Sequence, residues 1–188
     1  MKYVVPLCIA ASLLSGCGQR DRAAAPQDSS VGATTTPATM ASVQLVPTQG
    51  NTASGSLTLT TSDSAVQLSG TLSGLTPNGE FGFHIHEKGD CSAPDASSAG
   101  EHFNPASSQH GNPAGDPHHA GDMYNATSDA EGKARIEGKV AGVTLGSGQP
   151  TDILGRAVVL HANADDYSTQ PSGNSGARIA CGVIVRSP

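Results

Sequence analysis

Seven short segments of alternating or apolar residues constrain the fold of this chain more than any other feature. They span residues 41–47, 54–61, 65–75, 80–87, 133–140, 156–163 and 178–186, and turn sequences such as TPNG and SDAEG separate some of them. A period of two is typical of strands with one buried face. No amphipathic helix stands out between them. The pattern predicts an all-β fold, a Greek-key β-barrel or sandwich of about eight antiparallel strands.

The composition agrees with that fold, and the net charge excludes one class of partner. The chain has 23 glycines, 12 prolines and only 3% aromatic residues, which suits many turns around a core of small side chains. The formal net charge is −6. Nucleic-acid binding requires a basic surface, so we expect no nucleic-acid partner.

The N-terminal residues have the features of an export signal. Lys2 precedes the apolar stretch YVVPLCIAASLL, which is short for a membrane span, and LSGC ends at Cys17. LSGC resembles a bacterial lipobox, which implies a signal peptide over 1–16 and a lipidated Cys17. An ordinary cleaved signal with an incidental thiol is the alternative. Gly18 after the cysteine favours, by resemblance, a lipoprotein of the cell envelope that faces the periplasm at the outer membrane.

The rest of the chain divides into a tether and one domain. Residues 17–40 are polar, rich in alanine and interrupted by proline, which predicts a flexible linker. Residues 41–188 form the predicted domain. Of the four cysteines, Cys8 leaves with the signal and Cys17 carries lipid, so Cys91 and Cys181 remain. In an exported protein we expect these two to pair.

Two long segments do not read as strands. Residues 87–125 and 162–177 are rich in glycine, proline and polar residues, and each follows a segment that contains histidine. Compact domains seldom keep loops of this length without a function. We therefore expect the two loops to be functional.

Histidines are concentrated in the middle of the chain. All seven lie between residues 84 and 161. On a strand, His84 and His86 point to one face while Phe83 and Ile85 point to the other. That pair alone is also compatible with two hydrogen-bonded surface histidines. The remaining candidates are His102, His110, His118, His119, Asp122 and His161.

This set of side chains predicts metal binding. Imidazole suits copper and zinc, and a set that includes a carboxylate suits zinc. There are more candidate ligands than one tetrahedral site needs and enough for two. The chemistry therefore predicts a paired or binuclear site held between a strand and a loop.

Five motifs together resemble one family. GFHIHEKGDC, HFNP, HHAGD, VVLH and GNSGARIACGVI follow one another between residues 41 and 188. In this order they resemble the motifs of copper/zinc superoxide dismutase in its bacterial exported form. The resemblance implies a sandwich or barrel fold and an enzyme whose cofactors are copper and zinc.

The resemblance also implies a role for each site residue. Copper ligands would be His84, His86, His102 and His161, and zinc ligands would be His102, His110, His119 and Asp122, so that His102 bridges the metals. The HxGD spacing selects His119, and His118 stays ambiguous. Asp165 would link His84 to His110, and Arg178 would lie beside the open copper position. Cys91 and Cys181 match the intrachain disulfide.

The implied function is the removal of superoxide. Copper would cycle between two oxidation states and convert superoxide to dioxygen and hydrogen peroxide, with His102 taking up a proton, which would protect the cell envelope. A metal carrier, a zinc hydrolase and an inactive scaffold are the rival readings. The carrier would not need Arg178, and the hydrolase would need an open zinc position and a general base. Monomer and homodimer both remain open.

Overall fold

The domain is built from strands and long loops. The computed structural model describes residues 40–63, 65–115 and 117–188. Its strands are β1 (Met40–Pro47), β2 (Ser54–Ser62), β3 (Ala65–Ser73), β4 (Glu80–Phe81), β5 (Phe83–His86), β6 (Ala126–Thr127), β7 (Ala134–Ala141), β8 (Ala157–His161) and β9 (Arg178–Arg186). One 3-10 helix, η1, spans Ser97–Ala99.

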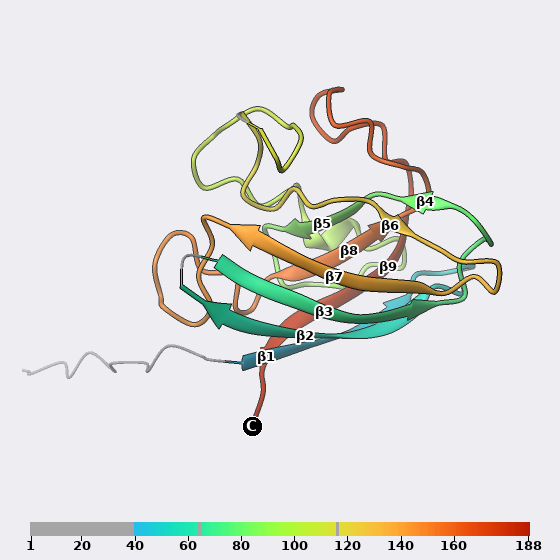
Figure 1. Cartoon of the computed structure of the whole chain (residues 1–188), viewed down its shortest axis with the longest axis horizontal. Helices are drawn as coiled ribbons and strands as arrows, with labels where there is room; N and C mark the ends of the chain where they lie inside the picture. Colours follow the sequence, from blue (N-terminus) through green and yellow to red (C-terminus); the bar gives the residue numbers. More distant parts are fainter. Residues whose placement is uncertain (1–39, 64, 116) are drawn as a thin grey trace, which may run out of the picture. The chain divides into compact units, whose positions relative to one another are not determined.

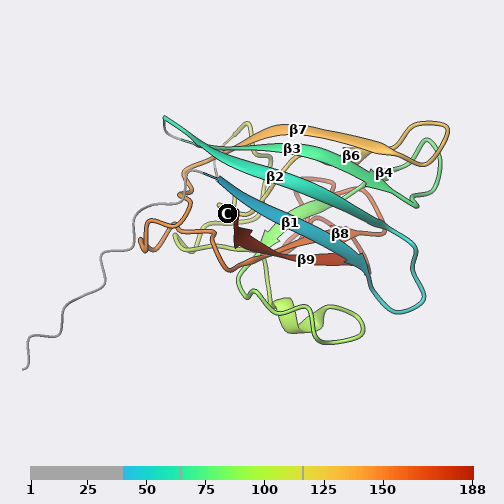
Figure 2. The ribbon, with the colours of Figure 1, turned by 90° about the horizontal axis from the view of Figure 1, so that it is seen from below.

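The strands form one large curled sheet and one small sheet. The large sheet has seven strands in the order β5-β8-β9-β1-β2-β3-β7, and β4 pairs with β6 in the small one. Every pairing between these strands is antiparallel. Figures 1 and 2 show the large sheet curling around a single interior. The predicted all-β fold with two long loops is confirmed.

Period-two alternation places the core. In β1, Ala41, Val43 and Leu45 are at most 1% exposed, and in β2 Leu57 and Leu59 face the same interior. Burying each leucine contributes about 1.5–3 kcal/mol relative to its exposure to water. The apolar faces of the strands thus fix the backbone from which the site residues project.

The structure differs from the expected strands at three places. The segment 80–87 is split into β4 and β5 at Gly82, whose N–H donates to Asn163 O over 2.7 Å, while its carbonyl accepts from His161 N over 2.8 Å. A side chain at Gly82 would meet Ser175 Cβ at 2.6 Å, so the 162–177 loop interrupts the strand here. The short β6 had not been expected. Met40, assigned to the linker, begins β1.

The two long loops contact each other and the strands. Both rise on the side of the molecule where β5 lies, as Figure 1 shows in yellow-green and orange-red. His110 N donates to Gln170 Oε1, and Gln170 Nε2 donates back to His110 O, each over 2.9 Å. The loops therefore meet through paired hydrogen bonds near a predicted metal ligand.

A disulfide ties the first loop to the sheet. Cys91 and Cys181 are bonded with their Cα atoms 5.8 Å apart and 90 residues apart in sequence, so the predicted pairing is confirmed. Closing a loop of this length stabilises the fold by up to roughly 4–5 kcal/mol in the chain-entropy model. The start of the 87–125 loop is thereby fixed to β9.

The N-terminal predictions lie mostly outside the described residues. The signal peptide over 1–16, Cys17 and all of the linker except Met40 belong to this part of the chain. Among the residues that the structure describes, no helix is long and apolar enough to span a membrane.

Candidate metal centre

Four histidines from three elements meet in the interior. His84 and His86 project from β5, His161 ends β8, and His102 comes from the first loop. One ring nitrogen from each lies within 4.8 Å of the others. β8 pairs with β5 in a register that places Val159 opposite His84, and an isolated bridge pairs His86 with His102. Backbone pairing therefore brings together ligands that lie far apart in sequence.

Three of these rings are oriented by a hydrogen bond from one ring nitrogen to an oxygen of the protein. His84 Nε2 donates to Asp165 Oδ2 over 2.7 Å, and His86 Nδ1 donates to the carbonyl of Gly100 over 2.8 Å. His161 Nδ1 donates to the carbonyl of Gly176 over 3.2 Å. A hydrogen bond at one ring nitrogen leaves the lone pair of the other available to a metal. His84 Nδ1 is indeed buried without a hydrogen-bond partner.

Burial keeps these three imidazoles neutral. Desolvation is the main cause that lowers the pKa of His84 to about 4, of His86 to about 2 and of His161 to about 3. Asp165 opposes the shift at His84 through its hydrogen bond. Since only neutral imidazole binds metal, these three rings can bind a metal at neutral pH without first losing a proton to solvent.

A second cluster surrounds the carboxylate of Asp122. Asp122 Oδ1 lies 2.8 Å from His102 Nδ1, 3.1 Å from His110 Nδ1 and 3.3 Å from His119 Nδ1. The four side chains are buried. Four ligands bound tetrahedrally to zinc stand about 3.3 Å apart, as follows from the usual Zn–N and Zn–O distances. The separations seen here are close to that value.

Two ring nitrogens of this cluster have no hydrogen-bond partner. His110 Nδ1 and His119 Nδ1 are buried and make no hydrogen bond, despite their closeness to Asp122. Burial raises the pKa of Asp122, but the hydrogen bond from His102 and the close approach of the His110 and His119 rings outweigh burial and hold the pKa far below its ordinary value. A buried polar atom without a partner costs about 1–3 kcal/mol. A bound cation would remove that cost.

His110 differs from the three histidines described above. Burial lowers its pKa, but Asp122 and Asp165 together outweigh burial and raise the pKa to about 9. Without metal this ring is therefore protonated at neutral pH. Zinc displaces a proton when it binds such a ring.

His102 belongs to both clusters. Its Nδ1 is hydrogen-bonded to Asp122 Oδ1, while its Nε2 is buried and has no partner. Its ring centre lies 3.9 Å from that of His84. The ring thus presents one nitrogen to each set of ligands.

Asp165 connects the clusters from outside. Its two carboxylate oxygens accept from His84 Nε2 over 2.7 Å and from His110 Nε2 over 2.9 Å. Burial raises the pKa of Asp165, but hydrogen bonds from His110 and His84 outweigh it and lower the pKa. The structure places this side chain where the sequence motifs had put it, between the two ligands.

Asn125 holds Asp165 in place and was not expected. Asn125 Nδ2 donates to Asp165 O over 3.0 Å, and Asp165 N donates to Asn125 Oδ1 over 2.9 Å. The backbone N–H of Asn125 donates to Tyr167 Oη over 2.8 Å. In the sequence, Asn125 begins the tripeptide NAT, which matches a glycosylation pattern and does not indicate this role.

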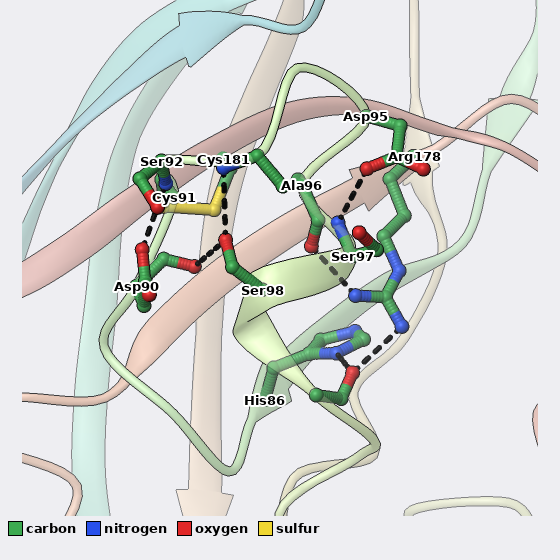
Figure 3. The surroundings of a disulfide bond; sticks show 12 residues. His86, Asp90, Cys91, Ser92, Asp95, Ala96, Ser97, Ser98, Arg178 and Cys181 are labelled. Carbon is green, nitrogen blue, oxygen red and sulfur yellow. Dashed lines mark hydrogen bonds between the residues drawn. A yellow bond between two sulfur atoms is a disulfide. The ribbon is translucent and has the colours of Figure 1, made fainter.

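Arg178 lies beside the first cluster and is held by backbone carbonyls. Its Nη1 donates to Ala96 O over 2.7 Å and its Nη2 to Gly100 O over 2.6 Å. The Gly100 carbonyl also accepts from His86 Nδ1. Figure 3 shows these contacts next to the disulfide. The half-buried guanidinium borders a hollow of about 440 Å³ that Thr48, Asn51 and Asp95 also line.

His118 lies outside both clusters. Its side chain is half-buried, and its Nδ1 donates to the carbonyl of His119 over 2.7 Å. The ambiguity between the two neighbouring histidines is thus resolved by position, because His119 is the one that reaches Asp122.

Comparison with known proteins decides the family. Residues 53–184 match the family model described as copper/zinc superoxide dismutase. The chain belongs to the copper/zinc superoxide dismutase family. It is therefore a superoxide dismutase, an oxidoreductase whose cofactors are copper and zinc, and its two histidine clusters fit these metals.

Individual relatives agree with this assignment. Superoxide dismutase [Cu-Zn] 2 of Aquifex aeolicus is 42% identical over 149 residues, which cover 77% of this chain and 85% of the relative. Superoxide dismutase [Cu-Zn] of Caulobacter vibrioides is 42% identical over 135 residues, 69% of this chain and 77% of that one. The crystal structure of a superoxide dismutase-like protein from Bacillus subtilis has a TM-score of 0.67 at 41% identity and covers 75% of this chain and 95% of that one.

Proposed function

We propose that this chain converts superoxide to dioxygen and hydrogen peroxide at a copper joined through His102 to a zinc. Two superoxide anions and two protons give one molecule of each product. The observation that carries the proposal is that the buried His102 ring has its two nitrogens on different clusters. Its Nδ1 is hydrogen-bonded to Asp122, and its Nε2 has no hydrogen-bond partner. Copper would be held by His84, His86, His102 and His161, and zinc by His102, His110, His119 and Asp122.

The protein residues have separate tasks in this reaction. Bound copper supplies the one-electron exchange, which zinc cannot supply. His84, His86 and His161 bind through nitrogens whose orientation is fixed by Asp165, Gly100 and Gly176. His102 Nε2 is the atom at which this chain holds a proton for the peroxide product. The carboxylate of Asp122 keeps the His102 ring in place by accepting a hydrogen bond from Nδ1.

Arg178 is proposed to bind the anion. Arginine stays protonated at any working pH and keeps free N–H groups beyond those used for Ala96 and Gly100. The 162–177 loop contains no lysine or arginine, so this guanidinium and the metals supply the local attraction. A chain with net charge −6 needs such a local positive site to attract an anion.

The rival metal carrier is separated from the enzyme by one experiment. Superoxide decay is followed with the copper- and zinc-loaded protein against the same protein after metal removal. The enzyme removes superoxide only when loaded. A loaded protein that removes no superoxide would contradict the proposal and favour the carrier.

We further propose that the enzyme is anchored in the cell envelope by lipid on Cys17, faces the periplasm at the outer membrane and protects the envelope from superoxide. The support is the LSGC sequence that follows the apolar N-terminal stretch. We expect the full chain to sediment with bacterial membranes and to be released by detergent, and Cys17→Ala to move into the soluble periplasmic extract. A membrane-bound Cys17→Ala variant would contradict the anchor.

A further inference from the structure

A second hollow opens beside the proposed zinc ligands. It has a volume of about 250 Å³ and is lined by Glu87, Glu101, His102, Asn104, His119 and Pro171. The two glutamates are exposed, whereas His102 and His119 are 5% and 7% exposed. The hollow therefore has an acidic rim and two metal-ligand candidates at its inner wall.

Backbone pairing holds the two glutamates opposite each other. The N–H of Glu87 donates to the carbonyl of Glu101 over 2.9 Å, directly after the bridge between His86 and His102. Like charges placed opposite each other on paired strands are destabilising. The fold thus keeps an unfavourable pair of carboxylates at the mouth of this hollow.

Nearby positive charge only partly offsets the pair. Lys88 Nζ lies 3.7 Å from Glu87 Oε1, and both side chains are well exposed, so this contact is weak. Arg156 approaches the backbone of Glu87 by donating to its carbonyl over 2.5 Å, while its guanidinium stacks on Phe103. Within the described residues Glu101 makes no ion pair, and it is the freest negative charge on the rim.

The inner wall independently points to a cation. His119 lines this hollow, and its Nδ1 is a buried atom without a hydrogen-bond partner. The hollow at Arg178 is lined by one positive and one negative side chain, Arg178 and Asp95, and by none of the metal-ligand candidates. Of these two hollows, the one at Glu87 and Glu101 is therefore the one that reaches metal-ligand candidates.

We propose that the hollow between Glu87 and Glu101 is the port through which zinc reaches its ligands, with Glu101 as the main attracting charge. The proposal rests on the zinc ligands assigned above. An imidazole carries no negative charge with which to attract a distant cation, whereas a carboxylate at a partly enclosed mouth raises the local cation concentration and the rate of association.

The test measures the rate of zinc uptake. Metal-free protein with its disulfide intact is mixed with Zn²⁺ in a stopped-flow instrument, and a fluorescent zinc indicator reports the free ion. At about 10 mM salt we expect Glu101→Gln to take up zinc about three- to tenfold more slowly than the unsubstituted chain. The difference should vanish at about 0.5 M salt, where exposed charges are screened.

Three variants make the test specific. Glu87→Gln should slow uptake less than Glu101→Gln, because Lys88 already offsets part of its charge, and Lys88→Gln should speed uptake. Glu131→Gln removes a carboxylate that is also exposed, from the turn between β6 and β7, and should leave the rate unchanged. Equal rates for Glu101→Gln and Glu131→Gln would overturn the port, as would a loss that salt does not remove.

Final zinc content distinguishes a failed port from a failed zinc site. Glu101→Gln should reach the same content as the unsubstituted chain, because the four ligands are unchanged. If the unsubstituted chain binds zinc but Glu101→Gln is not slowed, only the port is wrong. If the unsubstituted chain binds no zinc, the ligand assignment itself is wrong.

Discussion

We expect His86→Ala to lower superoxide removal at least about 100-fold, because even residues that only support a metal ligand change activity or affinity by about 10–100-fold. The His86 ring is 1% exposed, its pKa is lowered to about 2 by burial, and its Nδ1 is fixed by Gly100. Its Nε2 lies 3.3 Å from His161 Nε2, where a shared metal would be bound. The rate is measured as superoxide decay, and copper is counted in the same sample.

The matched control is His118→Ala. His118 is a half-buried histidine that offers no ligand atom to either cluster, and its ring hydrogen-bonds only to the backbone carbonyl of His119, so its loss should leave both rate and copper content unchanged. Far-ultraviolet circular dichroism and retained zinc would show that His86→Ala is folded. A folded His86→Ala variant that keeps its copper and removes superoxide at the full rate would contradict the assignment of this ligand.

Arg178→Ala is expected to lower the rate about tenfold at low salt and to weaken its dependence on salt. The guanidinium is the cation that borders the hollow beside the first cluster, and two carbonyls keep it there. Without the guanidinium, the site loses the positive charge that attracts superoxide and the N–H groups that hydrogen-bond to it. Initial rates are compared from low to high ionic strength with equal copper content.

Two further variants separate charge from geometry. Arg178→Lys keeps the charge but loses the planar pair of donors that reach Ala96 and Gly100, and we expect it to recover the salt dependence more than the rate. Arg135→Ala removes an exposed arginine paired with Glu137 on β7 and should change neither. An Arg178→Ala rate equal to that of the unsubstituted chain at low salt would exclude the proposed role in anion binding.

Much of the fold could be predicted because the alternation of apolar and polar residues along a strand shows which face is buried. Alternation identified the buried faces of β1, β2 and β3 and placed His84 and His86 together on one side of β5. The interruption at Gly82 could not be predicted in this way. It depends on the approach of a loop eighty residues further along the chain, which local sequence does not report.

The site could be predicted only in part from residue chemistry. Histidine type and number indicated paired metals, but the assignment of each ligand relied on the family motifs, because residues 87–125 have no periodicity from which to place His102, His110 and His119. Asn125 was missed since its role is to bind backbone atoms of Asp165. Ala96 and Gly100 were missed for a related reason, as carbonyl groups leave no mark in the side-chain sequence.

The most direct test of the whole account is superoxide decay measured on residues 40–188 at several degrees of copper loading, with copper and zinc counted in every sample. The account predicts one copper and one zinc per chain at saturation, and a rate that rises in proportion to copper and vanishes without it. A protein that holds both metals and removes no superoxide, or one whose rate is independent of copper, would contradict it.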